Sequence, residues 1–341
     1  MSFSVTLSNR ILHFKQPAGT SRGVYTTRKI WLIHLSDGQR TGVGECAPLP
    51  DLSCDALPDQ EYISILNKVC KDFCQSGGID YDSLRDYPSM LFGMETALLN
   101  LQNGDRLFDT AFSRGETGIP INGLVWMGNH DEMLQRLEEK LEKGFRCIKL
   151  KIGAIDFDQE LDLIRRIRDR FSFHEVELRV DANGAFPYDE ALYKLELLSQ
   201  YNIHSIEQPI KAGQWAFMAD LCRESPLPIA LDEELIGVND PAMKRHMLNI
   251  IKPRYIILKP SLHGGMAGCR EWIETARDLG IGSWITSALE SNIGLNAIAQ
   301  FAASIYGDHI TLPQGLGTGQ LFTDNIPMPL EVIKDRVFIK T

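Results

Sequence analysis

Five charged residues in the middle of the chain stand at regular intervals, each at the end of a short apolar or β-branched run. They are Lys151, Asp181, Glu207, Asp232 and Lys259. Consecutive members are 25 to 30 residues apart, which is about the length of one strand–helix unit. In a barrel of such units, side chains at the carboxyl ends of successive strands converge at one mouth. A single such residue could be a solvated loop charge, but the series, with both signs present, indicates an active site.

The three acids of this series offer hard oxygen ligands. Asp181, Glu207 and Asp232 belong to successive units, and carboxylates from neighbouring strands suit Mg²⁺, which retains waters and accepts substrate oxygens. Mn²⁺ accepts the same ligands and could substitute. The alternative is a set of structural salt bridges to Lys149, Lys151 and Arg179, which would not explain why all the acids stand at strand ends. We therefore predict a Mg²⁺ site.

Two lysines share one face of a strand in Lys149-Leu150-Lys151. Residues two apart point the same way, so Leu150 is expected to face the helices and both lysines the barrel interior. Close like charges lower the pKa of an amine, which would allow Lys151 to act as a base with help from Lys149. Lys259 is expected across the mouth. A metal flanked by two lysines suits removal of a proton next to a carboxylate.

Strand-like runs alternate with amphipathic segments from about residue 118 onward. The eight runs are 119–125, 147–152, 176–180, 204–207, 229–232, 255–259, 282–286 and 309–312. Helical periodicity separates most of them, for example over 132–143, 157–171, 190–199 and 266–279. This pattern predicts an α/β fold, a modified (β/α)₈ TIM-like barrel, rather than an open sheet.

The residues before 118 show a different pattern, with strand-like runs first and helical spacing afterwards. Residues 29–35 and 40–46 are strand-like around an Asp37-Gly38 turn, and 59–103 have helical spacing. We expect an α+β capping domain over 1–115, the barrel over 116–320, and a segment 321–341 that returns to the capping domain. Loops at 19–25 and 48–53, with Arg22 and Leu49, are expected to close over the substrate and select its distal part.

Composition restricts the class of partner. The chain has 341 residues and a net charge of −10, without a cluster of basic residues, which argues against nucleic acid or an anionic membrane as partner. It has no apolar run long enough to span a bilayer and no evident signal peptide. Seven cysteines without a CxxC pair indicate a reduced, cytoplasmic protein. We expect a small-molecule carboxylate substrate, and the oligomeric state stays open.

The motifs around the charged series resemble those of the enolase superfamily, muconate-lactonizing-enzyme subgroup, over nearly the whole chain. They are Gly44-Glu-Cys-Ala-Pro-Leu49, Lys149-Leu-Lys151, Val180-Asp-Ala-Asn-Gly184, Ile206-Glu-Gln-Pro209, Leu231-Asp-Glu233 and Leu258-Lys-Pro260. The resemblance implies Asp181, Glu207 and Asp232 as Mg²⁺ ligands. It also implies that Asn183 and Glu233 support the site from behind.

Within this subgroup the chain is most similar to the o-succinylbenzoate synthase family, through Asn122-Gly-Leu-Val-Trp126, Thr286-Ser-Ala-Leu-Glu-Ser291 and Gly315-Leu-Gly-Thr-Gly319. This implies syn-dehydration of 2-succinyl-6-hydroxy-2,4-cyclohexadiene-1-carboxylate to o-succinylbenzoate through an enediolate, in menaquinone biosynthesis. Lys151 would remove the proton α to the carboxylate and then protonate the departing hydroxyl on the same face. Lys259 would hold the ring by a cation–π contact.

Other activities of the superfamily are alternatives. N-succinylamino acid racemases share both lysines and the metal ligands, so this alternative stays open. Mandelate-racemase-like members place a His–Asp pair where this chain has Lys259. Dipeptide epimerases usually carry Asp-x-Asp where this chain reads Leu312-Pro-Gln-Gly315. A catalytically silent barrel usually lacks a ligand or a lysine, and none is missing here.

The expected substrate contacts are Leu49, Ser287, Ser291 and Gly315. Either serine could bind the succinyl end or cap a helix that starts near residue 292. Gly315 would let the backbone approach the substrate carboxylate. His263 is expected to be a solvated loop residue, and Trp126 and Trp284 ordinary barrel packing.

Overall fold

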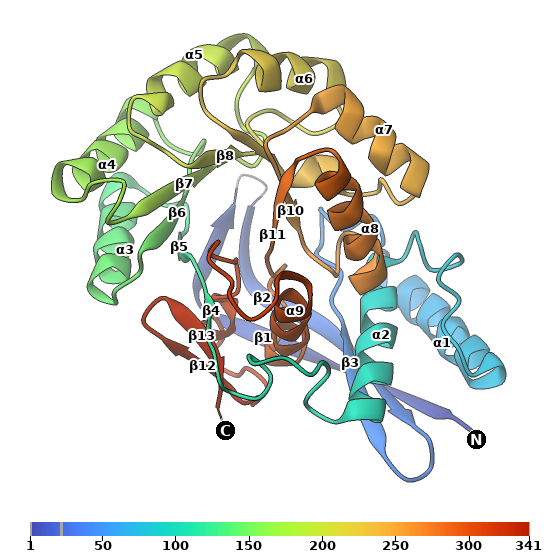
Figure 1. Ribbon diagram of the computed structural model, residues 1–341. Coiled ribbons are helices and arrows are strands. Elements are labelled where there is room, and N and C mark those ends of the chain that lie inside the picture. The colour runs from blue at the N-terminus through green and yellow to red at the C-terminus, as the bar shows by residue number, and fades with distance from the viewer. Residues whose placement is uncertain (1, 21–22, 341) are drawn as a thin grey trace.

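The computed structural model describes residues 2–20 and 23–340, and Figure 1 shows an antiparallel sheet beside a curled parallel sheet that is surrounded by helices. The antiparallel sheet comes first in the chain and has the order β1-β2-β3. Its strands and the two following helices are β1 (Ser4–Thr20), β2 (Gly23–Ser36), β3 (Thr41–Cys46), α1 (Asp59–Ser76) and α2 (Pro88–Asn103). The predicted α+β capping domain is confirmed in this architecture.

The two turns of this sheet differ in how well the sequence predicted them. Asp37 Oδ1 accepts hydrogen bonds from the backbone N–H groups of Gln39 and Arg40, both at 2.8 Å, which closes the predicted turn. The loop predicted at 19–25 is wrong for the residues of it that the structure describes. Gly19 pairs with Val24, so the strands continue as a ribbon through most of it. Arg22 lies outside the described residues.

Helix α2 packs closely against β3 because both surfaces carry glycine. A Cβ on Gly44 would lie 1.9 Å from the carbonyl oxygen of Gly93, and one on Gly42 would lie 2.2 Å from that of Ala97. Any larger residue would force the helix off the sheet. The rings of Trp31 and Tyr62, 4.5 Å between centroids, fill the core beside this contact.

The parallel sheet forms the barrel wall. In the described part of the chain it has seven strands in the order β11-β10-β9-β8-β7-β6-β5. They are β5 (Gly123–Val125), β6 (Cys147–Lys151), β7 (Glu177–Asp181), β8 (Ser205–Glu207), β9 (Ile229–Leu231), β10 (Tyr255–Leu258) and β11 (Gly282–Ile285). The helices that follow them in turn are α3 (His130–Glu142), α4 (Phe157–Arg170), α5 (Tyr188–Ser199), α6 (Trp215–Glu224), α7 (Pro241–Ile251), α8 (Gly265–Asp278) and α9 (Asn292–Tyr306).

The eighth predicted strand, 309–312, is wrong. The eighth position is occupied a few residues later, where Gln314 and Gly315 make isolated parallel bridges to Ile121 and Thr286. A Cβ on Gly315 would lie 2.0 Å from Thr286 Oγ1, so glycine is needed for this approach. The ring is therefore closed by one extended segment rather than by a full strand, and the barrel is modified as expected.

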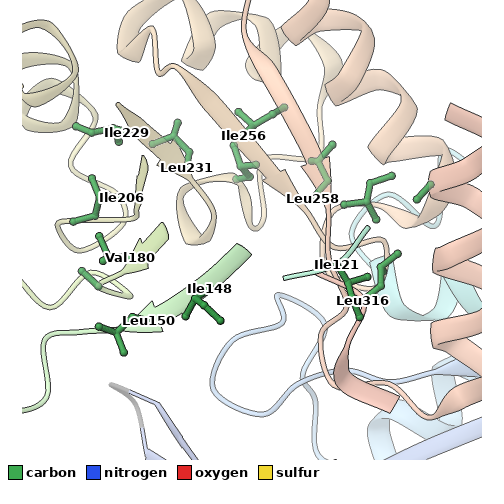
Figure 2. Packing of buried hydrophobic residues seen from close by; sticks show 14 of the residues in the cluster. Ile121, Ile148, Leu150, Val180, Ile206, Ile229, Leu231, Ile256, Leu258 and Leu316 are labelled. Carbon is green, nitrogen blue, oxygen red and sulfur yellow. The ribbon is translucent and has the colours of Figure 1, made fainter. Parts of the chain in front are cut away.

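Alternation along the strands separates the core from the barrel interior. Figure 2 shows the apolar side chains that face the helices, among them Ile148, Leu150, Val180 and Ile206. Leu150 is fully buried in this cluster, as the sequence predicted. Its neighbours Lys149 and Lys151 consequently point into the barrel.

The segment after residue 320 has two destinations. Lys15 N donates to Leu321 O at 2.8 Å, and Phe14 bridges Phe322, so the first part packs on β1 as predicted. The last part does not return to the capping domain. It forms the hairpin β12 (Leu330–Ile333) and β13 (Arg336–Ile339), and β13 pairs with β4 (Ile119–Pro120) directly before the barrel. The division at residues 115 and 320 stays a proposal.

A membrane-spanning helix needs a certain length and apolar character. Within residues 2–20 and 23–340, no helix combines the length and the apolar character needed to cross a bilayer.

Candidate active site

The five charged residues of the predicted series meet at the carboxyl ends of five neighbouring strands. Lys151, Asp181 and Glu207 are the last residues of β6, β7 and β8, and they are register partners in turn. Asp232 follows β9 directly, and Lys259 follows β10. The unit spacing in the sequence has thus become lateral adjacency at one barrel mouth.

Ion pairs link the lysines to the acids. Lys149 Nζ lies 2.7 Å from Asp181 Oδ2 and also contacts Glu207 Oε2. Lys151 Nζ lies 2.9 Å from Asp181 Oδ2, and Lys259 Nζ contacts Asp232 Oδ2. The acids are almost completely buried, so these contacts act in a medium that screens them poorly.

Arg179 does not join this cluster, although one sequence interpretation paired it with the acids. Its guanidinium lies 2.7 Å from Glu177 Oε1 and donates to Pro313 O at 2.9 Å, at the other end of β7. Salt bridges therefore do form at the mouth, but with Lys149, Lys151 and Lys259.

The charges shift one another's pKa values in different directions. Burial alone would raise the pKa of Asp181, but Lys149 and Lys151 outweigh it and lower that pKa. Burial and the facing Asp181 raise the pKa of Glu207 well above its usual value. Burial would lower the pKa of Lys149, but the surrounding carboxylates raise it. The carboxylates therefore determine the direction of the Lys149 shift, and its ammonium stays charged.

The donor set fits a hard divalent cation. Within the described residues, no three acidic, histidine or cysteine side chains already form a ready-made ion site. The chemistry of the acids nevertheless suits one. Glu207 Oε1 and Asp232 Oδ1 are buried and find no hydrogen-bond partner within residues 2–20 and 23–340. Buried carboxylate oxygens without a donor are costly unless a cation compensates them.

Asn183 connects the base candidate to a further acid. Lys151 Nζ donates to Asn183 Oδ1 at 2.6 Å, and Asn183 Nδ2 donates to Glu233 Oε1 at 2.8 Å. Asn183 lies two residues beyond Asp181, and its backbone N–H donates to Asp181 Oδ1 at 3.0 Å. The residue therefore orients both a lysine and a carboxylate.

A cavity of about 200 Å³ opens at this mouth. Lys151, Asn183 and Lys259 line its floor, while capping-domain residues Tyr25 and Leu49 contribute to its wall. Further lining comes from the loop after β11, from the closing segment and from the residues after it, at Ser287, Ala288, Leu289, Gly315 and Thr318. The cavity thus lies between the two domains, which is a common position for a substrate site.

The candidate substrate contacts divide into two groups. Leu49, Ser287 and Gly315 line the cavity. Ser291 does not appear among the described lining residues. Its hydroxyl accepts a hydrogen bond from Ile293 N at 3.1 Å and caps α9, and it donates to Glu45. Its other predicted role, as a helix cap, therefore describes it correctly.

His263 is a correction to the sequence interpretation. It is 1% exposed rather than solvated, and its Nδ1 accepts the backbone N–H of Lys259 at 2.8 Å. Burial lowers its pKa to about 3, so the ring is neutral and can accept this bond. The residue supports the chain at Lys259 from behind.

Trp126 is a site residue that the sequence interpretation assigned to ordinary packing. Its ring lines the cavity, with Lys151 Nζ 6.0 Å from the ring centroid. Its position in the sequence could have indicated this role, because Trp126 follows β5 directly and so stands at a strand end, as the five charged residues do. Trp284 also lines the cavity, from inside β11, where Arg179 lies over its ring.

Comparisons with known proteins agree with this geometry. The enolase C-terminal domain-like family model matches residues 132–332, and the MenC N-terminal domain model matches residues 20–101. The o-succinylbenzoate synthase of Desulfotalea psychrophila is 46% identical over 354 residues, covering 94% of this chain and 95% of that protein.

Two solved structures are similar to this chain at different levels of identity. The crystal structure of MenC from Desulfotalea psychrophila has a TM-score of 0.84 at 40% identity, covering 99% of this chain and 100% of that one. A dipeptide epimerase from Enterococcus faecalis, complexed with Mg and a dipeptide, has a TM-score of 0.81 at 18% identity, covering 99% and 97%. The second likeness shows the fold alone.

The curled barrel, its capping domain and the lysine–carboxylate mouth define the class: an enolase-superfamily protein. The 46% sequence identity to the Desulfotalea psychrophila protein, over 94% of this chain, identifies the family within that superfamily. The chain belongs to the o-succinylbenzoate synthase family, and the resemblance inferred from the motifs is confirmed.

Proposed function

We propose that this protein dehydrates 2-succinyl-6-hydroxy-2,4-cyclohexadiene-1-carboxylate to o-succinylbenzoate, a step of menaquinone biosynthesis, in the cytoplasm. The observation that carries the proposal is that Lys151 and Lys259 both line one interdomain cavity and pair there with the buried carboxylates of Asp181 and Asp232. The name of the 46% identical relative supports the choice of substrate.

Lys151 is the residue that moves the proton. Its amine, when neutral, takes the proton from the ring carbon that bears the carboxylate, and the resulting ammonium returns a proton to the hydroxyl that leaves the adjacent carbon. The carbon–hydrogen and carbon–oxygen bonds break on the same face, water departs, and the ring becomes aromatic. Asn183 orients Lys151 for both transfers through the 2.6 Å hydrogen bond.

Lys259 acts as a fixed cation. It is held at the mouth by Asp232 and by the bond from its own backbone N–H to His263. Burial would lower the pKa of Lys259, but Asp232 and Glu207 raise it, so the ammonium stays charged. A charged ammonium over the ring stabilises electron density that develops there.

Asp181, Glu207 and Asp232 would hold the metal ion, for which Mg²⁺ is the proposed identity and Mn²⁺ a substitute. When bound, the ion would supply a Lewis acid that stabilises the negative charge developing on the substrate carboxylate. Glu207→Gln should weaken Mg²⁺ binding measured by calorimetry without substrate. Equal affinity in wild type and variant would remove the ligand assignment.

The activity test compares two substrate classes under the same conditions. The purified protein is assayed with the cyclohexadiene substrate and with N-succinyl amino acids, with Mg²⁺ and with EDTA. We expect Mg²⁺-dependent dehydration that Lys151→Ala abolishes and that the surface variant Lys252→Ala leaves intact. Dehydration that persists in EDTA or in Lys151→Ala would overturn the mechanism, and racemisation without dehydration would overturn the substrate assignment.

A further inference from the structure

A buried arginine of the capping domain joins two walls of the cavity. Arg28 on β2 is 2% exposed. Its guanidinium donates to Pro48 O and Ala47 O, both at 2.5 Å, in the segment after β3. It also donates to Leu289 O at 3.1 Å and Ala288 O at 3.4 Å, in the loop after β11. One side chain therefore bonds two loops that belong to different domains.

The loop after β11 has further anchors that surround the arginine. Glu45 on β3 accepts hydrogen bonds from Ser291 N at 2.8 Å and Gly294 N at 2.9 Å. Glu290 accepts one from Ala288 N at 2.6 Å. Both carboxylates are fully buried. Burial lowers the pKa of Arg28, and the charges of Glu290 and Glu45 oppose that lowering. A buried guanidinium whose nitrogens all donate to backbone carbonyl oxygens makes a rigid junction between the two loops.

The backbone of Leu289 needs such support. Its φ is 66°, in the left-handed region that a leucine adopts unfavourably. The carbonyl group of this same residue accepts the bond from Arg28 Nε. A strained conformation persists only where its surroundings enforce it, and here the enforcing group comes from the other domain.

The two joined loops both supply residues to the lining of the cavity. Leu49 follows Pro48 directly, Leu289 follows Ala288, and both leucines line the cavity. Both also belong to one apolar cluster between the domains. Arg28 itself is not among the described lining residues, so it can influence a bound molecule only through these loops.

We infer that Arg28 is a positioning residue that sets the distance between the Leu49 and Leu289 walls before the substrate arrives. A preformed pocket reduces the ordering that binding would otherwise require. Arg28 would therefore influence the affinity for the part of the substrate that lies away from Lys151. This inference rests on the proposed function only for the identity of that substrate.

The test uses Arg28→Met, which keeps much of the side-chain volume, and Arg28→Lys, which keeps the charge. Arg168→Met is the matched control. Arg168 on α4 likewise donates to three carbonyl oxygens, those of Tyr201, Val176 and Asn202, but it lies outside the cavity lining. KM, kcat and the thermal midpoint are measured for all variants, together with amide hydrogen exchange of residues 286–291.

For Arg28→Met we expect about a tenfold rise in KM with kcat changed by less than about threefold, and faster exchange over 286–291. Arg28→Lys should fall between wild type and Arg28→Met, and it carries the test if Arg28→Met does not fold. Arg168→Met should lower the midpoint without changing KM. An unchanged KM at Arg28 with a lowered midpoint would mean a merely structural role and would overturn the inference.

Exchange also separates this inference from the proposed function. A wild-type protein that is inactive on the cyclohexadiene substrate defeats the proposed function and leaves the exchange comparison valid. Rapid exchange of 286–291 in the free wild-type protein would defeat the inference directly, whether or not the protein is active and whether or not the variants fold.

Discussion

Lys151 and Asn183 are joined by a hydrogen bond of 2.6 Å between Nζ and Oδ1. The two residues come from neighbouring strand ends, and Glu233 holds the amide of Asn183 from the far side at 2.8 Å. The proposed base is therefore not a freely rotating lysine. Its ammonium group is fixed by one amide and one carboxylate, Asp181.

Removal of the Asn183 amide should impair catalysis more than binding. For Asn183→Ala we expect kcat to fall by about 10- to 100-fold, because groups that orient reacting side chains have effects of this size. KM should change little. The control is Asn67→Ala, whose side chain donates to Ile63 O within its own helix. Steady-state kinetics decide, and a kcat within twofold of wild type would contradict the positioning role.

Replacement of Lys259 distinguishes a fixed cation from an acid–base group. Arginine keeps the positive charge but does not lose its proton in proteins, and methionine has neither property. We expect Lys259→Arg to retain at least about tenfold more dehydration activity than Lys259→Met. Equal loss in both variants would instead favour proton transfer by Lys259, the chemistry that a racemase requires.

Truncation of Leu49 should alter substrate binding. Leu49 is 5% exposed and lines the cavity, so Leu49→Ala should raise KM several-fold. Leu57, which packs on the capping-domain core, is the control. Each truncation should lower the free energy of unfolding by at most about 5 kcal/mol. Only Leu49→Ala should change KM. Identical kinetic constants in both variants would exclude Leu49 from the substrate site.

Glu95 should make stability depend on pH. It is buried on α2 and accepts Met266 N at 2.5 Å and Ala267 N at 2.9 Å, at the start of α8. Burial raises its pKa from 4.5 to about 7, against the effect of these donors. Because the folded-state pKa lies above the unfolded value, the stabilisation is present below pH 4.5 and is lost as pH rises through 7.

This contribution amounts to about 3–4 kcal/mol at most, from a rise of about 2.5 pKa units at about 1.4 kcal/mol per unit. Between pH 5 and 8 the denaturation midpoint of Glu95→Gln should therefore fall less than that of wild type. The exposed Glu274→Gln on the same α8 should follow wild type. Burial also raises the pKa of Glu160 to about 7, so the wild-type midpoint changes with pH for more than one reason. The measured quantity is therefore the difference in midpoint between Glu95→Gln and wild type at each pH. Parallel pH profiles for Glu95→Gln and wild type would contradict the assignment.

The sequence by itself determined the barrel and the composition of its mouth. Strand alternation placed Leu150 in the core and Lys151 in the interior, and the unit spacing brought Asp181 and Glu207 beside it. These features follow from local periodicity and from the rule that strand ends converge. Both can be read from one chain without knowledge of distant contacts.

Only the tertiary structure decided how the ring closes and how the cavity is walled. The closing bridges at Gln314 and Gly315 have no strand-like sequence, because contact with Ile121 and Thr286 rather than local propensity holds them. The same applies to Arg28, a strand residue whose four acceptors lie 19 to 261 positions away. Backbone carbonyls carry no residue-specific signal, so a junction made through them becomes visible only when the domains are packed together.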